Sequence, residues 1–329
     1  MKETAATPLL SVEGLRISGR RDGRTFPVVE EVSFELESGR LLALVGESGC
    51  GKSLTAAALL GLLPWGFSVD RGRIVLEGQE VLKLSGADWR RLRGRLVGAV
   101  FQNPLSALNP SLPIWRQVVE AAQLTFGLDR RAARARALEL LEIVGVPEAA
   151  SRLDDYPHQF SGGMRQRVAI GLALACNPRL LVADEPTTSL DLITQAEILR
   201  LLQRLRHERG LAILFITHDL SLVAEYADDV LVMYAGRTVE SGGVDGFLDR
   251  PLHPYSQALL GAIPRLDAPE ARLTDIEGVP PSPFDYPPAC RFAPRCPRAI
   301  ARCRREEPPW VGDEGHWAYC HRPCGPEAA

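Results

Sequence analysis

Short apolar runs alternate with helix-like patterns between residues 9 and 216. The runs at 41–45, 180–183 and 211–216 are continuously apolar, which is typical of strands buried on both faces of a parallel sheet. Helical periodicity between such runs gives the strand–helix–strand repetition of an α/β domain. The pattern therefore predicts an α/β fold built on a mostly parallel sheet.

Two segments depart from this pattern. Residues 103–159 are polar, Arg-rich and helix-patterned, for example at 131–144, and they predict an inserted helical subdomain. Residues 251–329 are first Pro-rich and then Cys-rich, with too few apolar residues for a core of their own. The expected organisation is a core formed by residues 1–102 and 160–250, a helical subdomain at 103–159 and a separate extension at 251–329.

Charge and hydropathy exclude several classes of protein. The net charge is −3, so no overall positive field attracts nucleic acid, and we expect no nucleic-acid partner. No segment reaches the roughly 18–20 uninterrupted apolar residues that span a bilayer, and the N-terminus has no apolar signal core. We expect a cytosolic chain that reaches the membrane only through a partner.

Residues 46–53, Gly-Glu-Ser-Gly-Cys-Gly-Lys-Ser, fit the pattern G-x-x-x-x-G-K-S between a predicted strand and a predicted helix. Backbone N–H groups of such a loop surround a phosphate, and the helix N-terminus favours its negative charge. Lys52 is expected to reach the β- and γ-phosphates, and the Ser53 hydroxyl to bind Mg²⁺. Cys50 is interpreted as a small filler residue, with a redox role as the alternative. The predicted nucleotide-binding residues are Gly46, Ser48, Gly49, Cys50, Gly51, Lys52, Ser53 and Leu54.

Polar residues follow several of the predicted strands. Asp184 and Glu185 end the run at 180–183, where one carboxylate suits Mg²⁺ and the other can polarise a water that attacks the γ-phosphate. Gln102 and His218 follow two further apolar runs. Since the carboxyl ends of parallel strands share one edge of a sheet, these side chains are expected to converge on the phosphates.

A Ser-Gly-Gly-Met turn at Ser161, Gly162, Gly163 and Met164 lies between these elements. Together the motifs resemble those of ABC transporter ATP-binding subunits. The matching segments, in chain order, are the Walker A motif at 46–53, the Q-loop at Gln102, the signature at 161–164, Walker B at 180–185, the D-loop at 189–191 and the switch histidine at His218. The resemblance implies a P-loop NTPase fold with an antiparallel β subdomain, an inserted helical subdomain and a small Cys-rich C-terminal extension.

The resemblance also implies a mechanism. Two subunits close head to tail over two ATP molecules, and the Ser161-Gly162-Gly163 turn of one covers the γ-phosphate bound by the other. Glu185 is the implied general base, with His218 and Gln102 completing the catalytic set, and Mg²⁺ is implied at Ser53, Gln102 and Asp184. The chain departs from the family pattern in two places. Met164 replaces a frequent Gln, and no aromatic residue for stacking on adenine stands at 17–19, which leaves Phe26 as an alternative.

The tail narrows the resemblance. His253-Pro254-Tyr255 and residues 290–297 resemble the C-terminal extension of dipeptide, oligopeptide and nickel importer ATPases. This implies a chain at the cytoplasmic face of the membrane whose ATP hydrolysis powers the import of peptides. The implied partners are two membrane-spanning permease subunits, an extracytoplasmic substrate-binding protein and a second ATP-binding subunit. A non-identical second subunit is favoured, and a homodimer stays open. Import of nickel or another small solute remains an alternative, as do a soluble ABC-type ATPase acting on nucleic acid or ribosomes and a module that holds ATP without hydrolysing it.

Five of the seven cysteines follow residue 289. Structural disulfides are disfavoured in a cytosolic protein, and the paired knuckle spacing of zinc sites is absent. Wider spacing fits an iron–sulfur cluster better, and some relatives that resemble this chain here carry a [4Fe–4S] cluster. Zinc and unligated thiols remain open. His316 and His321 are replacement ligands or, more simply, surface residues. The predicted cluster ligands are Cys290, Cys296, Cys303 and Cys320.

Overall fold

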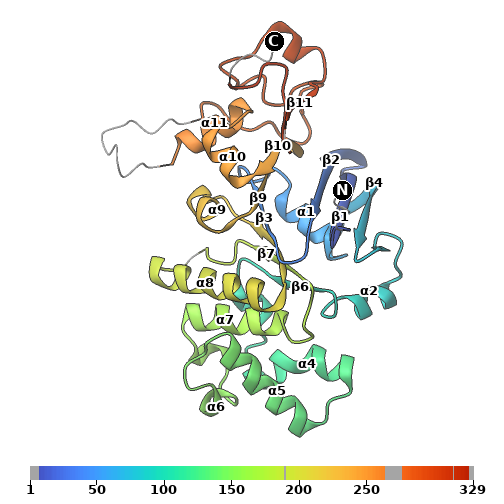
Figure 1. Ribbon diagram of the computed structural model, residues 1–329. Helices are drawn as coiled ribbons and strands as arrows, with labels where there is room; N and C mark the ends of the chain where they lie inside the picture. The colour runs from blue at the N-terminus through green and yellow to red at the C-terminus, as the bar shows by residue number, and fades with distance from the viewer. Residues whose placement is uncertain (1–6, 189, 264–275, 314, 326–329) are drawn as a thin grey trace, which may run out of the picture. The chain divides into compact units, whose positions relative to one another are not determined.

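The computed structural model describes residues 7–188, 190–263, 276–313 and 315–325. The chain forms two compact units: unit 1 comprises residues 1–10, 36–40 and 76–215, and unit 2 comprises residues 11–35, 41–75 and 216–329. Helices and strands alternate between residues 162 and 234 (Figure 1). Within the described ranges, no helix is both long enough and apolar enough to cross a membrane.

In unit 1 the strands β8, β7 and β6 lie next to one another in that order. β6 (Val97–Val100) pairs in parallel with β7 (Leu180–Asp184), which places Val97 opposite Leu180. β8 (Ala212–Ile216) is fully buried. The two apolar runs predicted as strands in this region are therefore β7 and β8. The remaining elements of unit 1 are β5 (Gln79–Glu80), α2 (Gly86–Leu92), α3 (Pro104–Ala107), α4 (Ile114–Phe126), α5 (Arg130–Ile143), α6 (Ala149–Arg152), the 3₁₀ turn η1 (Pro157–Gln159), α7 (Gly162–Ala173) and α8 (Leu192–Arg209).

Helices α4, α5 and α7 pack against one another (green in Figure 1). α4 buries Ile114, Val118 and Ala122 at four-residue spacing, so one stripe of the helix faces its neighbours. α5 begins at the Asp129 cap, whose carboxylate accepts a hydrogen bond from the Ala132 N–H at 2.8 Å. Helix α5 thus forms where the pattern at 131–144 predicts it.

Unit 2 contains a second series of strands in the order β11–β12–β10–β9–β3. β3 (Leu41–Val45) pairs in parallel with β9, whereas β9, β10, β12 and β11 pair in antiparallel fashion. The bounds are β9 (Asp229–Tyr234), β10 (Arg237–Gly243), β11 (Trp310–Asp313) and β12 (His316–Tyr319). The helices of this unit are α1 (Lys52–Leu59), α9 (Leu220–Tyr226), α10 (Val244–Asp249), α11 (Pro254–Gly261) and the 3₁₀ turn η2 (Ala301–Arg304).

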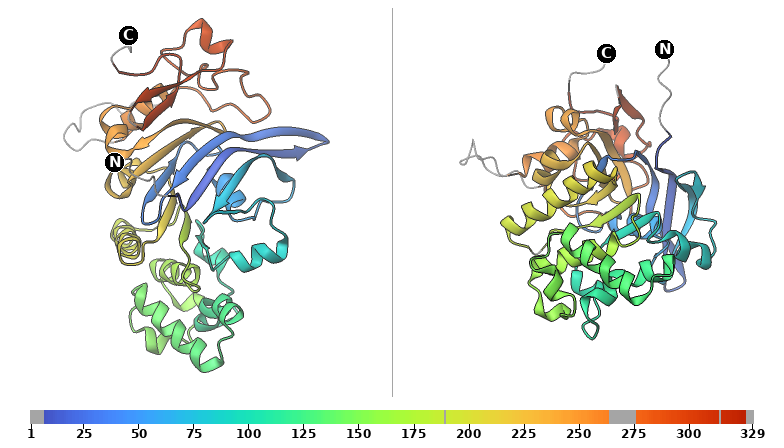
Figure 2. Two further views of the ribbon diagram at one scale, coloured as in Figure 1. Left: turned by 45° about the vertical axis from the view of Figure 1, so that its right-hand side comes forward. Right: turned by 60° about the horizontal axis from the view of Figure 1, so that its bottom comes forward.

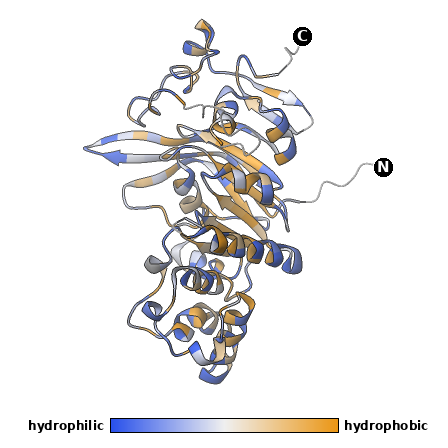
Figure 3. Ribbon diagram, turned by 90° about the vertical axis from the view of Figure 1, so that its left-hand side faces the viewer, coloured by the Kyte–Doolittle hydropathy of each residue, from blue (hydrophilic) through white to orange (hydrophobic). Residues whose placement is uncertain are grey.

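A long hairpin opens unit 2. β1 (Leu10–Arg21) and β2 (Arg24–Leu36) are joined by Asp22 and Gly23, with φ of 50° and 74°, the conformation of a tight antiparallel hairpin turn. β4 (Phe67–Leu76) pairs on the other side of β1. The hairpin extends outward in the left view of Figure 2, and its tip is hydrophilic while its strands carry hydrophobic positions (Figure 3).

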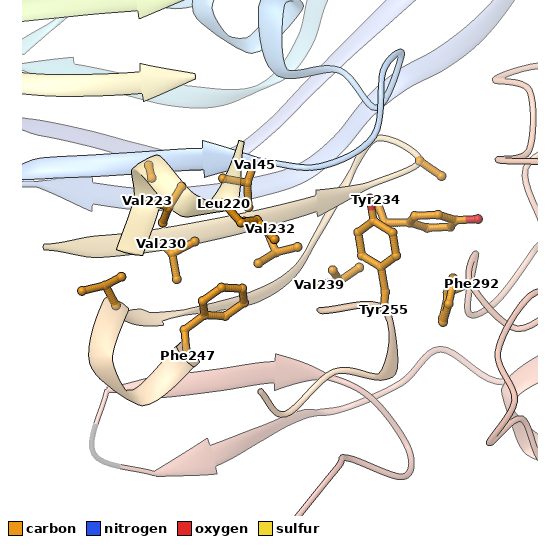
Figure 4. Packing of buried hydrophobic residues seen from close by; sticks show 13 residues of the cluster. Val45, Leu220, Val223, Val230, Val232, Tyr234, Val239, Phe247, Tyr255 and Phe292 are labelled. Carbon is orange, nitrogen blue, oxygen red and sulfur yellow. The ribbon is translucent and has the colours of Figure 1, made fainter. Parts of the chain in front are cut away.

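The C-terminal extension shares a core with the strands of unit 2. Tyr255 and Phe292, both almost fully buried, join a cluster with Val232, Tyr234 and Phe247 (Figure 4). The Tyr234 ring lies 4.7 Å from that of Tyr255 and 5.1 Å from that of Phe292. The extension therefore compensates for its few apolar residues by packing onto β9 and β10.

Candidate nucleotide-binding and hydrolysis site

The phosphate loop follows β3 and leads into α1. At Gly46 (φ 147°) an added Cβ would lie 2.1 Å from the Met233 carbonyl oxygen, so no larger residue fits. Gly51 caps α1 with a φ of 103°, in the left-handed region that favours glycine. The loop therefore turns between a buried strand and a helix N-terminus, as the motif predicts.

Lys52 folds back over this loop. Its side chain is buried, and its Nζ donates hydrogen bonds to the carbonyl oxygens of Gly46 at 2.6 Å and Glu47 at 3.1 Å. Cys50 lies in the same loop, and burial raises the pKa of its thiol. A protonated, buried thiol fits the interpretation of Cys50 as a filler residue. Ser48 and Ser53 are exposed.

His218 follows β8 and belongs to unit 2. It is exposed and lies between Thr217, whose hydroxyl accepts the Asp219 N–H at 3.0 Å, and Asp219, which caps α9 through the Ser221 N–H at 2.9 Å. Both hydrogen bonds fix the backbone on either side of the ring. His218 is thus presented at the end of a strand by an ordered turn.

In unit 1 the structure brings Gln102 and Glu185 together. The Gln102 Nε2 donates to the Glu185 Oε2 at 2.9 Å, and the Thr188 hydroxyl donates to the same oxygen at 2.9 Å. Glu185 has a φ of 48°, a left-handed conformation that costs a non-glycine residue about 1 kcal/mol and concentrates at functional sites. Asp184 ends β7 and is half-buried. Sequence reasoning missed Thr188, although its place three residues after Glu185 could have indicated it.

The signature turn starts helix α7. The Ser161 hydroxyl accepts the Met164 N–H at 3.3 Å, and Ser161 and Gly162 are exposed. At Gly163 an added Cβ would lie 2.3 Å from the Cγ2 of Thr194. The first turn of α8 therefore lies directly against the signature, a contact that sequence reasoning did not predict.

The D-loop leads into this turn of α8. The Asp191 carboxylate caps α8 by accepting the Thr194 N–H at 3.0 Å and the Thr194 hydroxyl at 2.7 Å. These hydrogen bonds hold the pKa of Asp191 below its usual value. Ser189 lies outside the described residues.

The predicted motifs are divided between the units. The phosphate loop and His218 lie in unit 2, whereas Gln102, the signature and the acidic pair lie in unit 1. Phe26, the alternative for adenine, packs its ring against that of Phe284 with centroids 4.2 Å apart.

The cysteines of the extension are all free thiols and mostly buried. Burial raises the pKa of Cys290 to about 11 and that of Cys320 to about 12, and the neighbouring thiols Cys296 and Cys303 add to the rise at Cys320. Among the residues that the structure describes, no three His, Cys, Asp or Glu side chains are placed to hold a metal ion. The predicted [4Fe–4S] ligand set therefore has no counterpart among the residues that the structure describes.

The interpretation of His316 as a surface residue is wrong. His316 is buried, and its Nε2 lies 2.7 Å from the Oε1 of Glu240, a carboxylate that is itself fully buried. Glu240 also accepts the backbone N–H groups of Leu252 and His253 at 2.8 and 2.7 Å. The imidazole therefore belongs to a buried polar network that connects β10, β12 and the start of α11. His321 is half-buried, with its Nε2 3.1 Å from the Glu306 carbonyl oxygen.

Solved structures of ATP-binding cassettes are similar to this chain. The ATP-binding cassette MJ0796, in a dimeric post-hydrolysis structure with ADP and Pi, matches with a TM-score of 0.65 and 25% identity, over 71% of this chain and 98% of that chain. The structure of cbiO1 from Clostridium perfringens, part of the ABC transporter complex cbiONQ, matches with a TM-score of 0.64 and 28% identity, over 74% and 92% of the two chains. These likenesses confirm the predicted P-loop NTPase fold class.

The chain also matches two family models and several curated relatives. Residues 29–188 match the ABC transporter model, and residues 239–303 match the C-terminal region of oligopeptide/dipeptide transporters. A putative peptide import ATP-binding protein of Brucella abortus is 48% identical, over 92% of this chain and 91% of that protein. The dipeptide transport ATP-binding protein of Escherichia coli is 42% identical, over 96% and 97%. The chain therefore belongs to the ABC transporter family, in the group that carries the oligopeptide/dipeptide transporter C-terminal region.

Proposed function

We propose that this chain is the ATP-binding and ATP-hydrolysing subunit of an ABC transporter that imports peptides across the cytoplasmic membrane. The similarity to peptide and dipeptide transport proteins along nearly the whole chain supports the transport role. One observation carries the hydrolytic role: Glu185 stands at the end of a buried parallel strand, in a strained conformation, with its carboxylate held by Gln102 and Thr188.

The phosphate loop supplies the nucleotide site of the proposal. Backbone N–H groups between Gly46 and Ser53 bind the phosphates, and the Lys52 ammonium neutralises the β- and γ-phosphates. Lys52 already lies buried over the loop carbonyls. This position lets the ammonium approach phosphates in the loop with little loss of side-chain freedom.

The hydrolysis residues act on water and the γ-phosphate. Glu185 accepts a proton from the attacking water as the new P–O bond forms, and the bond to ADP breaks so that ADP and phosphate leave. Gln102 and Thr188 hold the carboxylate oxygen that performs this step. We assign to His218 the orientation of the γ-phosphate and the water.

We assign the binding of Mg²⁺ to Ser53, Gln102 and Asp184. The bound ion would neutralise negative charge on the phosphate oxygens. The structure supports their availability, because Ser53 is exposed in the first turn of α1 and Asp184 ends a strand adjacent to the one that Gln102 follows. Hydroxyl, amide and carboxylate oxygens are ligands that Mg²⁺ favours.

The proposed assembly places this chain at the cytoplasmic face of the membrane, bound to two membrane-spanning permease subunits. A second ATP-binding subunit, non-identical in our proposal, closes over it, and an extracytoplasmic binding protein delivers the peptide. The Ser161-Gly162-Gly163 turn acts on the ATP of that second subunit, because the N-terminus of α7 is exposed and attracts anions. Nickel or another small solute is the alternative cargo.

The function is tested with purified chain and its complex. Lys52→Ala is expected to raise the Kd for MgATP at least about tenfold, since it removes a charge-assisted phosphate contact. Glu185→Gln is expected to keep ATP binding and to lower turnover by about a hundredfold or more, because general base catalysis is lost. Arg302→Gln, on an exposed ion pair with Glu306, serves as the control. Unchanged hydrolysis in Glu185→Gln contradicts the proposal, and transport assays of peptides against nickel in vesicles identify the cargo.

The [4Fe–4S] cluster is a separate, finer proposal. It is supported by the sequence spacing of Cys290, Cys296, Cys303 and Cys320, and by the hydrogen bond from the Cys290 N–H to the Cys303 carbonyl oxygen at 3.1 Å, which holds two of these residues side by side. Protein purified without oxygen should contain iron and absorb broadly in the visible range, and Cys303→Ser should lose both signals while Cys324→Ser keeps them. Colourless wild-type protein with bound zinc, or with no metal, contradicts the cluster.

A further inference from the structure

Two residues of the C-terminal extension bind Glu47 of the phosphate loop. The Glu47 backbone N–H donates to the hydroxyl of Tyr255 at 2.8 Å. The Glu47 carboxylate receives two hydrogen bonds from Arg295, at 2.7 Å from Nη1 and 3.0 Å from Nη2. Tyr255 and Arg295 are more than two hundred residues away along the chain, yet they fix both the main chain and the side chain of a loop residue.

Arg295 is itself firmly held. Its Nε donates to the Glu277 carbonyl oxygen at 2.9 Å and its Nη2 to the Ile276 carbonyl oxygen at 2.9 Å. The side chain is only 5% exposed, and Nη1 also lies 3.3 Å from the Tyr234 hydroxyl. The paired carboxylate of Glu47 raises the pKa of Arg295 above its ordinary value. A bidentate pair of this kind gives both strength and fixed geometry.

Tyr255 is equally constrained. It is completely buried, and its ring packs against those of Tyr234 and Phe292 at 4.7 and 5.4 Å (Figure 4). Burial raises the pKa of its phenol, so the hydroxyl stays neutral. Its position is therefore set by the core of unit 2 and not by the loop that it contacts.

We propose that Tyr255 and Arg295 are positioning residues through which the C-terminal extension sets the affinity of the phosphate loop for ATP. This inference rests on the proposed nucleotide site. Two physical effects carry it. The hydrogen bond from the Glu47 N–H fixes the peptide unit between Gly46 and Glu47, whose carbonyl oxygen, that of Gly46, accepts from the Lys52 Nζ at 2.6 Å, so it orders the loop that binds phosphate. Arg295 compensates the Glu47 carboxylate, which otherwise places a negative charge in the loop that must accept polyphosphate.

The coupling acts in both directions. If an ordered extension strengthens ATP binding, bound ATP must stabilise the extension by the same free energy. The segment at 286–298, which contains Phe292 and Arg295, is therefore expected to exchange its amide hydrogens more slowly when nucleotide is bound. A merely structural role of Arg295 would not make this exchange depend on nucleotide.

The central test is the affinity of full-length protein for MgATP. Arg295→Gln is expected to raise the Kd about fivefold to twentyfold, because an uncompensated carboxylate remains in the loop. Glu47→Gln added to this variant removes that charge and should restore most of the affinity. Tyr255→Phe, which removes only the acceptor of the Glu47 N–H, should raise the Kd about threefold to tenfold.

Two variants of the same chemistry control for general effects of changing the extension. Tyr319→Phe removes a hydroxyl that donates to Glu307 at 2.8 Å, and Arg302→Gln breaks the exposed pair with Glu306. Both are expected to bind ATP like the wild type. Thermal unfolding without nucleotide identifies any variant that fails to fold. If a variant fails to fold, the proposal is tested instead by amide hydrogen exchange of residues 286–298 in the wild type, measured with and without MgADP.

The outcomes separate the two proposals. If Lys52→Ala loses ATP affinity while folded Arg295→Gln and Tyr255→Phe retain it, this inference is overturned and the nucleotide site stands. Exchange at 286–298 that is independent of nucleotide overturns it as well. If the wild type binds no ATP, the proposed function itself fails.

Discussion

At the scale of single residues, the packing of the signature against α8 requires a residue without a Cβ at Gly163. The Cβ of an alanine at position 163 would lie 2.3 Å from the Thr194 Cγ2. Thr194 cannot rotate away without losing its hydroxyl hydrogen bond to Asp191 at 2.7 Å. We therefore expect Gly163→Ala to destabilise the protein by about 1–3 kcal/mol, the usual cost of overpacking. It should also lower ATP turnover, because α7 must shift from α8.

Thermal unfolding and ATPase assays measure both effects of this substitution. Thr194→Ser removes the Cγ2 and keeps the hydroxyl, so Gly163→Ala with Thr194→Ser should recover most of the stability. Gly162→Ala is the matched control, since its Cβ would meet only the Leu190 Cδ2 at 3.7 Å. Equal stability of Gly163→Ala and Gly162→Ala would show that the α7–α8 contact is not tight.

At the scale of elements, helix α11 begins at a histidine whose charge state matters. The His253 Nδ1 accepts the Tyr255 N–H at 3.1 Å, and burial lowers the pKa of His253 to about 4, while the nearby Glu240 carboxylate opposes this shift less strongly. In the unfolded chain His253 binds a proton near pH 6.5, whereas in the folded protein it does so only near pH 4. The free energy of unfolding therefore keeps the full contribution of His253 above pH 6.5 and decreases as the pH falls toward 4. Between pH 7 and pH 5 the expected loss is about 2 kcal/mol.

Denaturant unfolding at several pH values measures this loss. His253→Asn keeps a side-chain acceptor at the cap and cannot titrate, so its stability should change less between pH 7 and pH 5 than that of the wild type. His207→Asn, at an exposed position of α8, should retain the full dependence. A wild-type slope in His253→Asn would assign the acid sensitivity to other groups.

Elements with a strong local signal were predictable from the sequence. Strand β3 covers the same five residues as its apolar run, and α5 follows its periodic pattern within one residue. The carboxyl ends of β6 and β7 bring Gln102 to Glu185, as the parallel topology requires. For these features, hydrophobic period and strand direction contain the necessary information.

Contacts between distant segments were not predictable in this way. Nothing near Arg295 in the sequence indicates Glu47 as its partner. Likewise, nothing near His316 indicates burial, because its contact with Glu240 forms only through the pairing of β12 with β10. The extension also does not stand apart as a body without a core, because Tyr255 and Phe292 enter the core of unit 2. Burial at these positions is decided by tertiary packing, which a local pattern does not encode.

At the scale of the whole molecule, the signature indicates a machine of two ATP-binding subunits. The exposed start of α7 lies against the start of α8, where Leu192 is 83% exposed and Ile193 75% exposed. Two large apolar side chains beside an exposed anion-attracting helix start are typical of a surface that a partner covers. We expect this surface to be buried when ATP closes the second subunit over the signature.

Leu192→Asp tests this surface, with Leu124→Asp on α4 as a matched control, because both leucines are 83% exposed. In the Glu185→Gln background, MgATP should produce a stable dimer of ATP-binding subunits, measured by light scattering on the chain alone and mixed with the second subunit. Leu192→Asp should weaken this dimer at least about tenfold, since it places a charge in a closing apolar contact. Leu124→Asp should leave it intact, because α4 is not part of that surface. A site that is completed by a partner's signature requires the dimer before hydrolysis can begin. Equal weakening of the dimer by both substitutions therefore contradicts the assignment of Leu192 to the dimer surface. A chain that stays monomeric with MgATP, both alone and mixed with the second subunit, contradicts it as well.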